Sequence, residues 1–195
     1  MEPLDYALFR AHVYDEPNRL AAFLKGHLWV ERCLNSYLDQ ALVRAEVLNI
    51  AKESFSRKVN LAEALGLVEN YASALRAMNA VRNRIAHDLD HELARDDVKQ
   101  MYAPLIAAVA TTDPDLSQGL RMHAEEPLGE AISKWFELCL STLQMRVLAM
   151  HAENAWHEDL SAALSSGPRA PLPSAPNKVN PADVWTNRTV SGGLD

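Results

Sequence analysis

Glycine and cysteine are scarce in this sequence, and it contains no long hydrophobic run. Only seven glycines and two cysteines occur among 195 residues. Few glycines together with abundant Ala, Leu, Glu and Arg favour helices, and two cysteines in a chain of this length argue against a disulfide framework. We expect Cys33 and Cys139, which lie among apolar residues, to be buried free thiols. The longest apolar stretch, APLIAAVA at 103–110, is far shorter than the ~20 residues of a membrane-spanning helix, so we expect no membrane segment.

Several sequence signals of location and chemistry are also missing. The first residues, MEPLDYALFR, do not place an apolar run after a basic cap, so we expect no secretory signal. Together with the cysteine usage, this predicts a cytoplasmic location. The sequence has no glycine-rich phosphate loop, no Cys-x-x-Cys pair and no nucleophile elbow, which argues against the enzyme classes that depend on them.

Apolar residues recur at spacings of three and four along most of the chain, which predicts an all-α, up-down helical bundle. The apolar content of 48% is sufficient for a packed core. The segment TTDPDLSQGL at 111–120 is expected to be a loop, and Pro104 to kink the helix that contains it. The expected helices span 3–13, 18–50, 54–66, 71–87, 95–112 and 127–164.

The composition changes abruptly at Ser165. Residues 165–195 hold five of the ten prolines and show neither a helical nor a strand period. We therefore divide the chain into a helical domain, 1–164, and a proline-rich tail, 165–195, that is extended or flexible. Trp185 is the one large anchor in this tail, which suits docking to an antitoxin or another regulatory protein, and a solvated terminus is the alternative.

The stretch RNRIAH, at the end of the helix expected over 71–87, gathers groups suited to phosphodiester chemistry. Asn83 and His87 are four residues apart and share a helix face, and the long side chain of Arg82 reaches the same surface. Arginine binds phosphate oxygens in a planar fork, and histidine transfers protons near neutral pH. The trio suits RNA cleavage by the neighbouring ribose 2′-hydroxyl, which requires neither a metal nor a protein nucleophile. The alternative is a helix C-terminus stabilised by cationic groups.

Charge is unevenly distributed around this motif. The net charge of −7 argues against non-specific nucleic-acid binding. Residues 52–84 nevertheless carry a local balance of +3, whereas residues 88–130 carry −7. Three basic residues extend the predicted RNA-binding surface: Arg57, Lys58 and Arg84. Pairing of Lys58 with Glu63 or Glu69 is an equally good alternative.

A metal site is the competing hypothesis for the same segment. The sequence HDLDH places His87 and His91 four residues apart, so both imidazoles share a face if the helix continues. The doublet formed by His87 and Asp88 resembles HD-type metal-dependent phosphohydrolases. In that case His27 and Asp159 are the candidates for the additional ligands.

Two neighbouring segments resemble the HEPN superfamily of small helical domains. They are FSRKVNLAEALGLV at 55–68 and LRAMNAVRNRIAHDLD at 75–90, and KGHLWVERCLNSYLDQAL at 25–42 fits the long first helix of those domains. A lysine-bearing helix ending in Leu-Gly-Leu, followed by a helix ending in Arg-Asn-x-x-small-His, is most similar to the branch that includes the mannitol operon repressor. The resemblance covers roughly residues 18–110.

The resemblance implies a helical bundle and, for the nuclease members of the superfamily, a metal-independent endoribonuclease. Their Arg-x(4–6)-His motif is matched here by Arg82, Asn83 and His87. Such members are often toxins of toxin–antitoxin or phage-defence systems and form homodimers in which two motifs face one cleft. Histidine then acts as general base or acid and arginine holds the scissile phosphate, with RNA as substrate and no cofactor. The mannitol operon repressor branch keeps a similar helix end and is regulatory, so a non-catalytic transcription regulator that acts as a protein-interaction module is the alternative.

Overall fold

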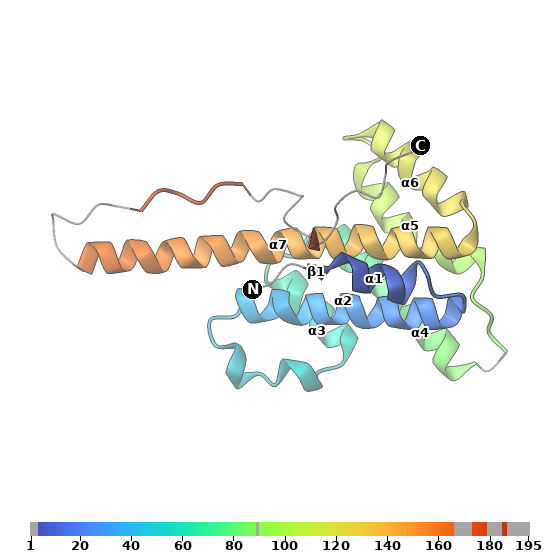
Figure 1. Ribbon diagram of the computed structural model, residues 1–195, viewed down its shortest axis with the longest axis horizontal. Helices are drawn as coiled ribbons and strands as arrows, with labels where there is room; N and C mark the ends of the chain where they lie inside the picture. Colours follow the sequence, from blue (N-terminus) through green and yellow to red (C-terminus); the bar gives the residue numbers. More distant parts are fainter. Residues whose placement is uncertain (1–3, 89, 166–172, 179–184, 187–195) are drawn as a thin grey trace.

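The computed structural model describes residues 4–88, 90–165, 173–178 and 185–186. These residues form a helical bundle with one pair of two-residue strands, which confirms the predicted all-α class (Figure 1). None of the described helices is long and apolar enough to cross a membrane. The elements are β1 (Leu4–Asp5), α1 (Tyr6–Val13), α2 (Arg19–Ala41), α3 (Phe55–Ala64), α4 (Glu69–His87), α5 (Arg95–Val109), α6 (Pro114–Glu125), α7 (Leu128–Ser165) and β2 (Trp185–Thr186).

The core is built around α2 and α7, which lie side by side (Figure 1). Phe23 packs on Phe136, with ring centroids 5.6 Å apart, and further along both helices the Cys33 thiol donates to the Gln144 side chain at 3.3 Å. Because the residue numbers increase on both helices from the first contact to the second, α2 and α7 run parallel. Gly26 permits this close approach, because a Cβ at this position would lie only 2.4 Å from Cδ2 of the Phe136 ring.

The two cysteines lie in this core. Cys33 and Cys139 are both free and buried, as predicted. Burial raises the pKa of the Cys33 thiol to about 12, although the charge of Arg32 lowers it. Burial also raises the pKa of Cys139, whose backbone carbonyl accepts a hydrogen bond from the Tyr71 hydroxyl. Both thiols are therefore packing groups in the folded chain.

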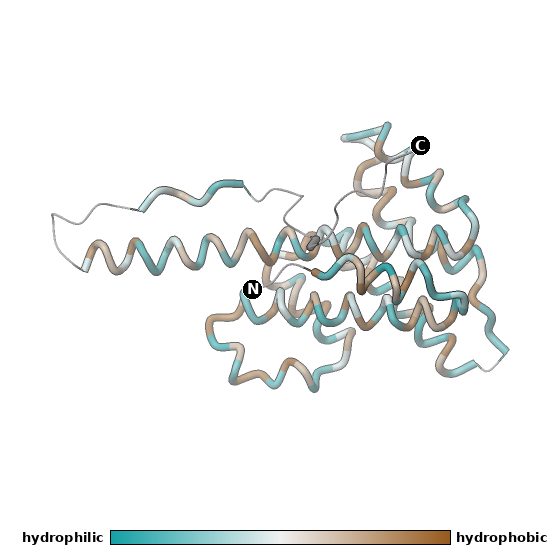
Figure 2. The backbone as a smooth tube through the Cα atoms, in the orientation of Figure 1, coloured by the Kyte–Doolittle hydropathy of each residue, from teal (hydrophilic) through white to brown (hydrophobic). Residues whose placement is uncertain are grey.

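The predicted loop over 111–120 is wrong, because Pro114–Glu125 forms α6. Asp113 accepts a hydrogen bond from the Leu116 N–H at 2.9 Å, and Pro114 occupies the first turn. This Asp-Pro pair is an N-cap followed by a proline at a position that needs no N–H donor, which starts a helix. The alternation of hydrophilic and hydrophobic residues along the tube is that of amphipathic helices (Figure 2).

The helix predicted over 18–50 is too long, since α2 ends at Ala41. Leu42 adopts an extended backbone (φ −93°, ψ 128°), and two short 3₁₀ turns, Ala45–Val47 and Ile50–Lys52, lead to α3. Ile50 is buried whereas most residues between 42 and 53 are exposed. The apolar residues that follow Ala41 therefore do not extend α2, because a helix continued through them would have no surface to pack against.

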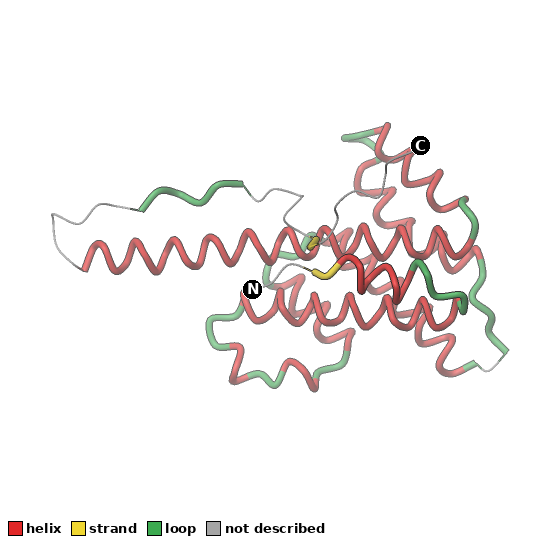
Figure 3. Tube along the Cα trace, viewed as in Figure 1, coloured by secondary structure: helices red, strands yellow, loops and turns green. Residues whose placement is uncertain are grey.

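The second half of α7 extends beyond the other helices (Figure 1). At 1.5 Å per residue, its 38 residues span about 57 Å. Part of the predicted tail lies beside it, because the Trp156 indole donates to the Pro173 carbonyl at 3.2 Å. Further along, β2 pairs in parallel with β1, a strand that the composition of the tail did not predict (Figure 3). The side chain of Trp185 and most of segment 165–195 lie outside the described residues.

Candidate functional site

The RNRIAH motif forms the last turn and a half of α4. The helix buries its apolar face through residues such as Met78 and Val81, and it ends at His87, since Asp88 adopts an extended backbone. Arg82, Asn83 and His87 are all exposed. All three predicted catalytic side chains therefore reach solvent on one end of one helix.

Arg82 differs from the other two arginines of α4. Arg76 forms an ion pair with Glu63. Arg84 forms an ion pair with Asp97 at 2.6 Å. Arg82 forms no ion pair with any carboxylate of the described residues, and its guanidinium donates instead to a neutral amide, that of the next residue, at 3.3 Å. An exposed guanidinium without a carboxylate partner keeps its full capacity to bind an anion.

A histidine of α2 lies buried near Arg82. His27 is 6% exposed, and its Nε2 has no hydrogen-bond partner among the described residues. Burial lowers the pKa of His27, and the charges of Arg82 and Lys58 lower it further, against the charge of Glu31 and a hydrogen bond with Asn79, which raise it. His27 therefore contributes a neutral imidazole to the polar layer between α2, α3 and α4. From the sequence, His27 is only a candidate ligand of the alternative metal site.

Lys58 belongs to the same buried layer and does not lie on the predicted RNA-binding surface. Its side chain is only 1% exposed, and its ammonium pairs with Glu31 at 2.6 Å. Glu31 is itself 27% exposed, so water still reaches the carboxylate. A buried lysine requires such a partner, and Lys58 pairs with α2 rather than with Glu63, which pairs with Arg76, or Glu69, which is exposed. Lys58 thus joins α2 to α3.

The other two residues of the predicted RNA-binding surface are occupied in different ways. Arg57 is exposed and forms an ion pair with Glu53 at 3.2 Å. Arg84 is tied to Asp97, which also accepts a hydrogen bond from the Ala94 N–H at 2.9 Å. Burial raises the pKa of Asp97, but these hydrogen bonds and the neighbouring positive charges outweigh burial and hold it below its usual value. Arg84 therefore fixes the start of α5 against the end of α4.

The helical premise of the metal hypothesis does not hold. Because α4 ends at His87, His91 lies beyond the helix and does not share a face with it. The His91 Nε2 is 3.1 Å from the Asp97 carboxylate. Among the residues that the structure describes, no group of three or more His, Cys, Asp or Glu side chains is placed to hold a metal ion.

Comparison of the chain with protein-family models, with characterised proteins and with solved structures finds no match. The HEPN resemblance therefore rests on the motif and its helical context alone. The site itself is an exposed Arg–Asn–His set, close to a buried histidine and a buried lysine whose glutamate partner is partly exposed.

Proposed function

We propose that this chain is a metal-independent endoribonuclease that acts as a homodimer in the cytoplasm, within a toxin–antitoxin or phage-defence system. The observation that supports this best is the environment of Arg82, which lies next to Asn83 and near His87 on α4. Arg82 is exposed and has no carboxylate partner among the described residues. An arginine kept only for stability is expected to be paired, as the two others of α4 are. An antitoxin or another regulatory protein docked on the tail, 165–195, is the corresponding partner.

The chemistry follows from the three side chains. His87 takes the proton of the ribose 2′-hydroxyl, and the 2′-oxygen attacks the adjacent phosphorus. A 2′-O–P bond forms, the P–O5′ bond breaks, and the leaving 5′-oxygen takes a proton from a protonated imidazole. The Arg82 guanidinium binds the non-bridging oxygens as their charge grows, and the Asn83 carbonyl accepts from that guanidinium and fixes its orientation. The products are a 2′,3′-cyclic phosphate and a 5′-hydroxyl.

Helix geometry favours two copies at one site. Residues five apart on an α-helix are rotated by about 140° relative to each other, so the Arg82 and His87 side chains leave α4 in different directions, although the Arg82 guanidinium reaches Asn83. In a twofold dimer, the guanidinium of one protomer and the imidazole of the other face a shared phosphate. The second histidine then supplies the acid for the leaving group.

A suitable dimer surface lies next to the motif. Leu20, Leu24 and Leu28 form an exposed apolar stripe on α2, at a spacing of four residues. His27 on α2 lies close enough to the end of α4 to be affected by the charge of Arg82, whereas Tyr37, further along α2, donates to the Leu65 carbonyl just before α4 begins. The two helices therefore run antiparallel, and this half of α2 lies near the C-terminal half of α4. Covering this stripe with a second copy removes apolar surface from water and brings the two motifs together.

A non-catalytic regulator is the second candidate function. It is favoured by the burial of Lys58 and the pairing of Arg84, which leave a smaller basic surface than the sequence predicts. The net charge of −7 also disfavours broad RNA affinity. In this case the exposed Arg82 binds a partner protein, and the α2 stripe serves assembly alone.

The deciding experiment incubates the chain with RNA in the presence of EDTA. Wild type is expected to leave 2′,3′-cyclic phosphate ends, and His87→Ala and Arg82→Gln to lose at least about 100-fold in rate. His151→Ala, which removes an exposed histidine from α7, is the matched control and should cleave normally. Leu24→Glu should sediment as a monomer and lose cleavage. Equal cleavage by wild type and His87→Ala, or none by either, rejects the nuclease and favours the regulator.

A further inference from the structure

An apolar cavity lies at the opposite end of α4 from the RNRIAH motif. It has a volume of about 230 Å³ and opens between the start of α4 and helices α5, α6 and α7. Since α6 packs mainly on α5 and contacts α7 less, space remains between α6 and α7. Its apolar walls include Leu67, Leu105, Val109, Leu116, Leu120 and Leu138.

The mouth of this cavity exposes large apolar side chains. Leu116 is 47% exposed and Val68 is 51% exposed. Both line the cavity, so both would lose water contact if a ligand filled it. Burial of apolar surface is the main favourable term in ligand binding, and the cavity therefore favours an apolar ligand body.

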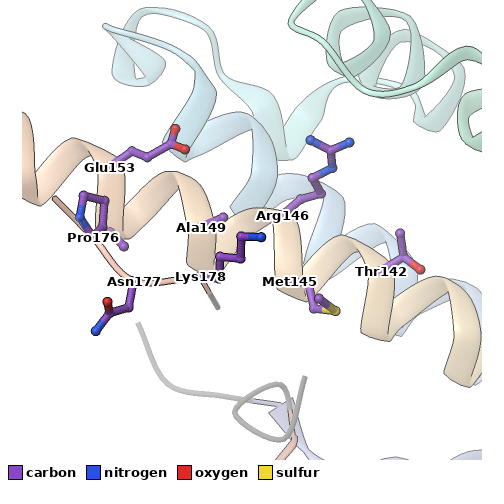
Figure 4. Close-up of a pocket in the computed structure, with 9 residues that line it drawn as sticks. Thr142, Met145, Arg146, Ala149, Glu153, Pro176, Asn177 and Lys178 are labelled. Atoms are coloured by element: carbon purple, nitrogen blue, oxygen red, sulfur yellow. The ribbon is translucent and has the colours of Figure 1, made fainter. Parts of the chain in front are cut away.

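The cavity has a cation at its edge. Arg146 lines it from α7, is exposed, and forms no ion pair with a carboxylate of the described residues. Arg146 also lines an adjoining, more open hollow of about 500 Å³, which Lys178 of the tail shares (Figure 4). Glu153 borders this hollow two turns further along α7 (Figure 4). The charge next to the apolar cavity is thus that of the guanidinium, which binds a carboxylate in a bidentate fork.

We propose that this cavity binds a medium-chain aliphatic carboxylate, with its alkyl chain between α5, α6 and α7 and its carboxylate on Arg146. The chain length follows from the volume. An apolar cavity of ~150 Å³ binds benzene, which has six carbons, so one of about 230 Å³ suits a ligand with roughly eight or nine carbons. The site is separate from Arg82 and His87, so it stands whether or not the chain cleaves RNA.

The test is calorimetric titration of the full chain with octanoate, below the concentration at which it forms micelles. Octanoate should bind, and butyrate should bind much more weakly because it buries less apolar surface. Octan-1-ol should bind about tenfold more weakly than octanoate because it lacks the charge. Arg146→Gln should weaken octanoate binding by about tenfold and leave octan-1-ol binding unchanged.

Two further variants make the titration decisive. Arg121→Gln removes an exposed arginine of α6 that lines a different hollow, and it should bind octanoate like wild type. Ala108→Leu adds three carbons inside the cavity and should abolish binding of octanoate and octan-1-ol alike. The proposal is overturned if butyrate and octanoate bind equally, if Arg146→Gln binds like wild type, if Ala108→Leu still binds, or if octanoate does not bind at all.

Discussion

Gly26 lies at the closest approach of α2 to α7, where an added methyl group has no room. A Cβ at this position would be 2.4 Å from Cδ2 and 2.5 Å from Cε2 of Phe136, against the ~3.5–4.0 Å of an unstrained carbon contact. Phe136 is fully buried and packs edge-on against both Phe23 and Trp135. Its ring therefore has no free space to move into, and the two helices must separate to accept an alanine.

The expected loss in stability follows from two opposing terms. Alanine gains about 1 kcal/mol over glycine inside a helix, whereas overpacking a core costs about 1–3 kcal/mol. The contact is short by more than 1 Å, so we expect the upper end of that cost and a net loss of about 1–2 kcal/mol for Gly26→Ala. Gly119→Ala is the matched control, because nothing lies within 4 Å of its Cβ position. It should gain about 0.5–1 kcal/mol.

Guanidinium chloride denaturation followed by far-ultraviolet circular dichroism measures both variants. Gly26→Ala should also melt about 2–8 °C below wild type, and Gly119→Ala about 1–4 °C above it, at ~2–4 °C per kcal/mol for a chain of this size. If Gly26→Ala is as stable as wild type, α2 and α7 do not approach each other as closely as described.

Three further outcomes follow from buried polar groups and thiols. Because burial lowers the pKa of His27, the folded state binds a proton less readily than the unfolded state. The free energy of unfolding should therefore fall as the pH drops below about 6.5, the pKa of an unfolded histidine, by up to ~1.4 kcal/mol per unit of pKa depression. In denaturation curves recorded at a series of pH values, His27→Gln should show a smaller dependence of stability on pH. Removing the Glu31 carboxylate leaves the Lys58 ammonium buried without a partner and should lower the free energy of unfolding, measured in urea, by about 2–3 kcal/mol, a value reduced for the partial exposure of the carboxylate. Lys58→Met removes the buried charge itself and should cost less than 1 kcal/mol. Equal losses for the two variants would contradict this. Cys33 and Cys139 should react with a thiol reagent only as fast as the chain unfolds, so a rapid reaction of the folded chain would refute their burial.

The helical class was predictable because it is written in local patterns. Apolar spacing of three and four marks each helix, and caps such as Ser54, which accepts from the Arg57 N–H, mark where several begin. Gly66, with φ +101°, ends α3 as its sequence position suggests. α6 was missed because Asp113 and Pro114 are common both in loops and at helix starts, and local sequence alone does not distinguish the two.

The candidate site was predictable only in part. The sequence identifies Arg82 and His87 by residue type and spacing, and the structure places both on the surface. It does not reveal that Lys58 reaches across to Glu31, because that pairing depends on the packing of α3 against α2. His27 stands out in the sequence as a polar residue within the apolar face of α2, but its contact with α4 depends on the tertiary structure and could not be predicted.

The parallel packing of α2 with α7 delays completion of the core during synthesis. The hydrogen bond between Cys33 and Gln144 joins positions 111 residues apart. At ~5–20 residues per second, a ribosome needs roughly 5–20 s to make the residues between them. For that interval, the face of the nascent α2 that Phe136 later covers is exposed to solvent, where chaperones can bind it. Truncation within α7 would leave the same face bare permanently, so such fragments should accumulate as aggregates rather than as smaller folded domains.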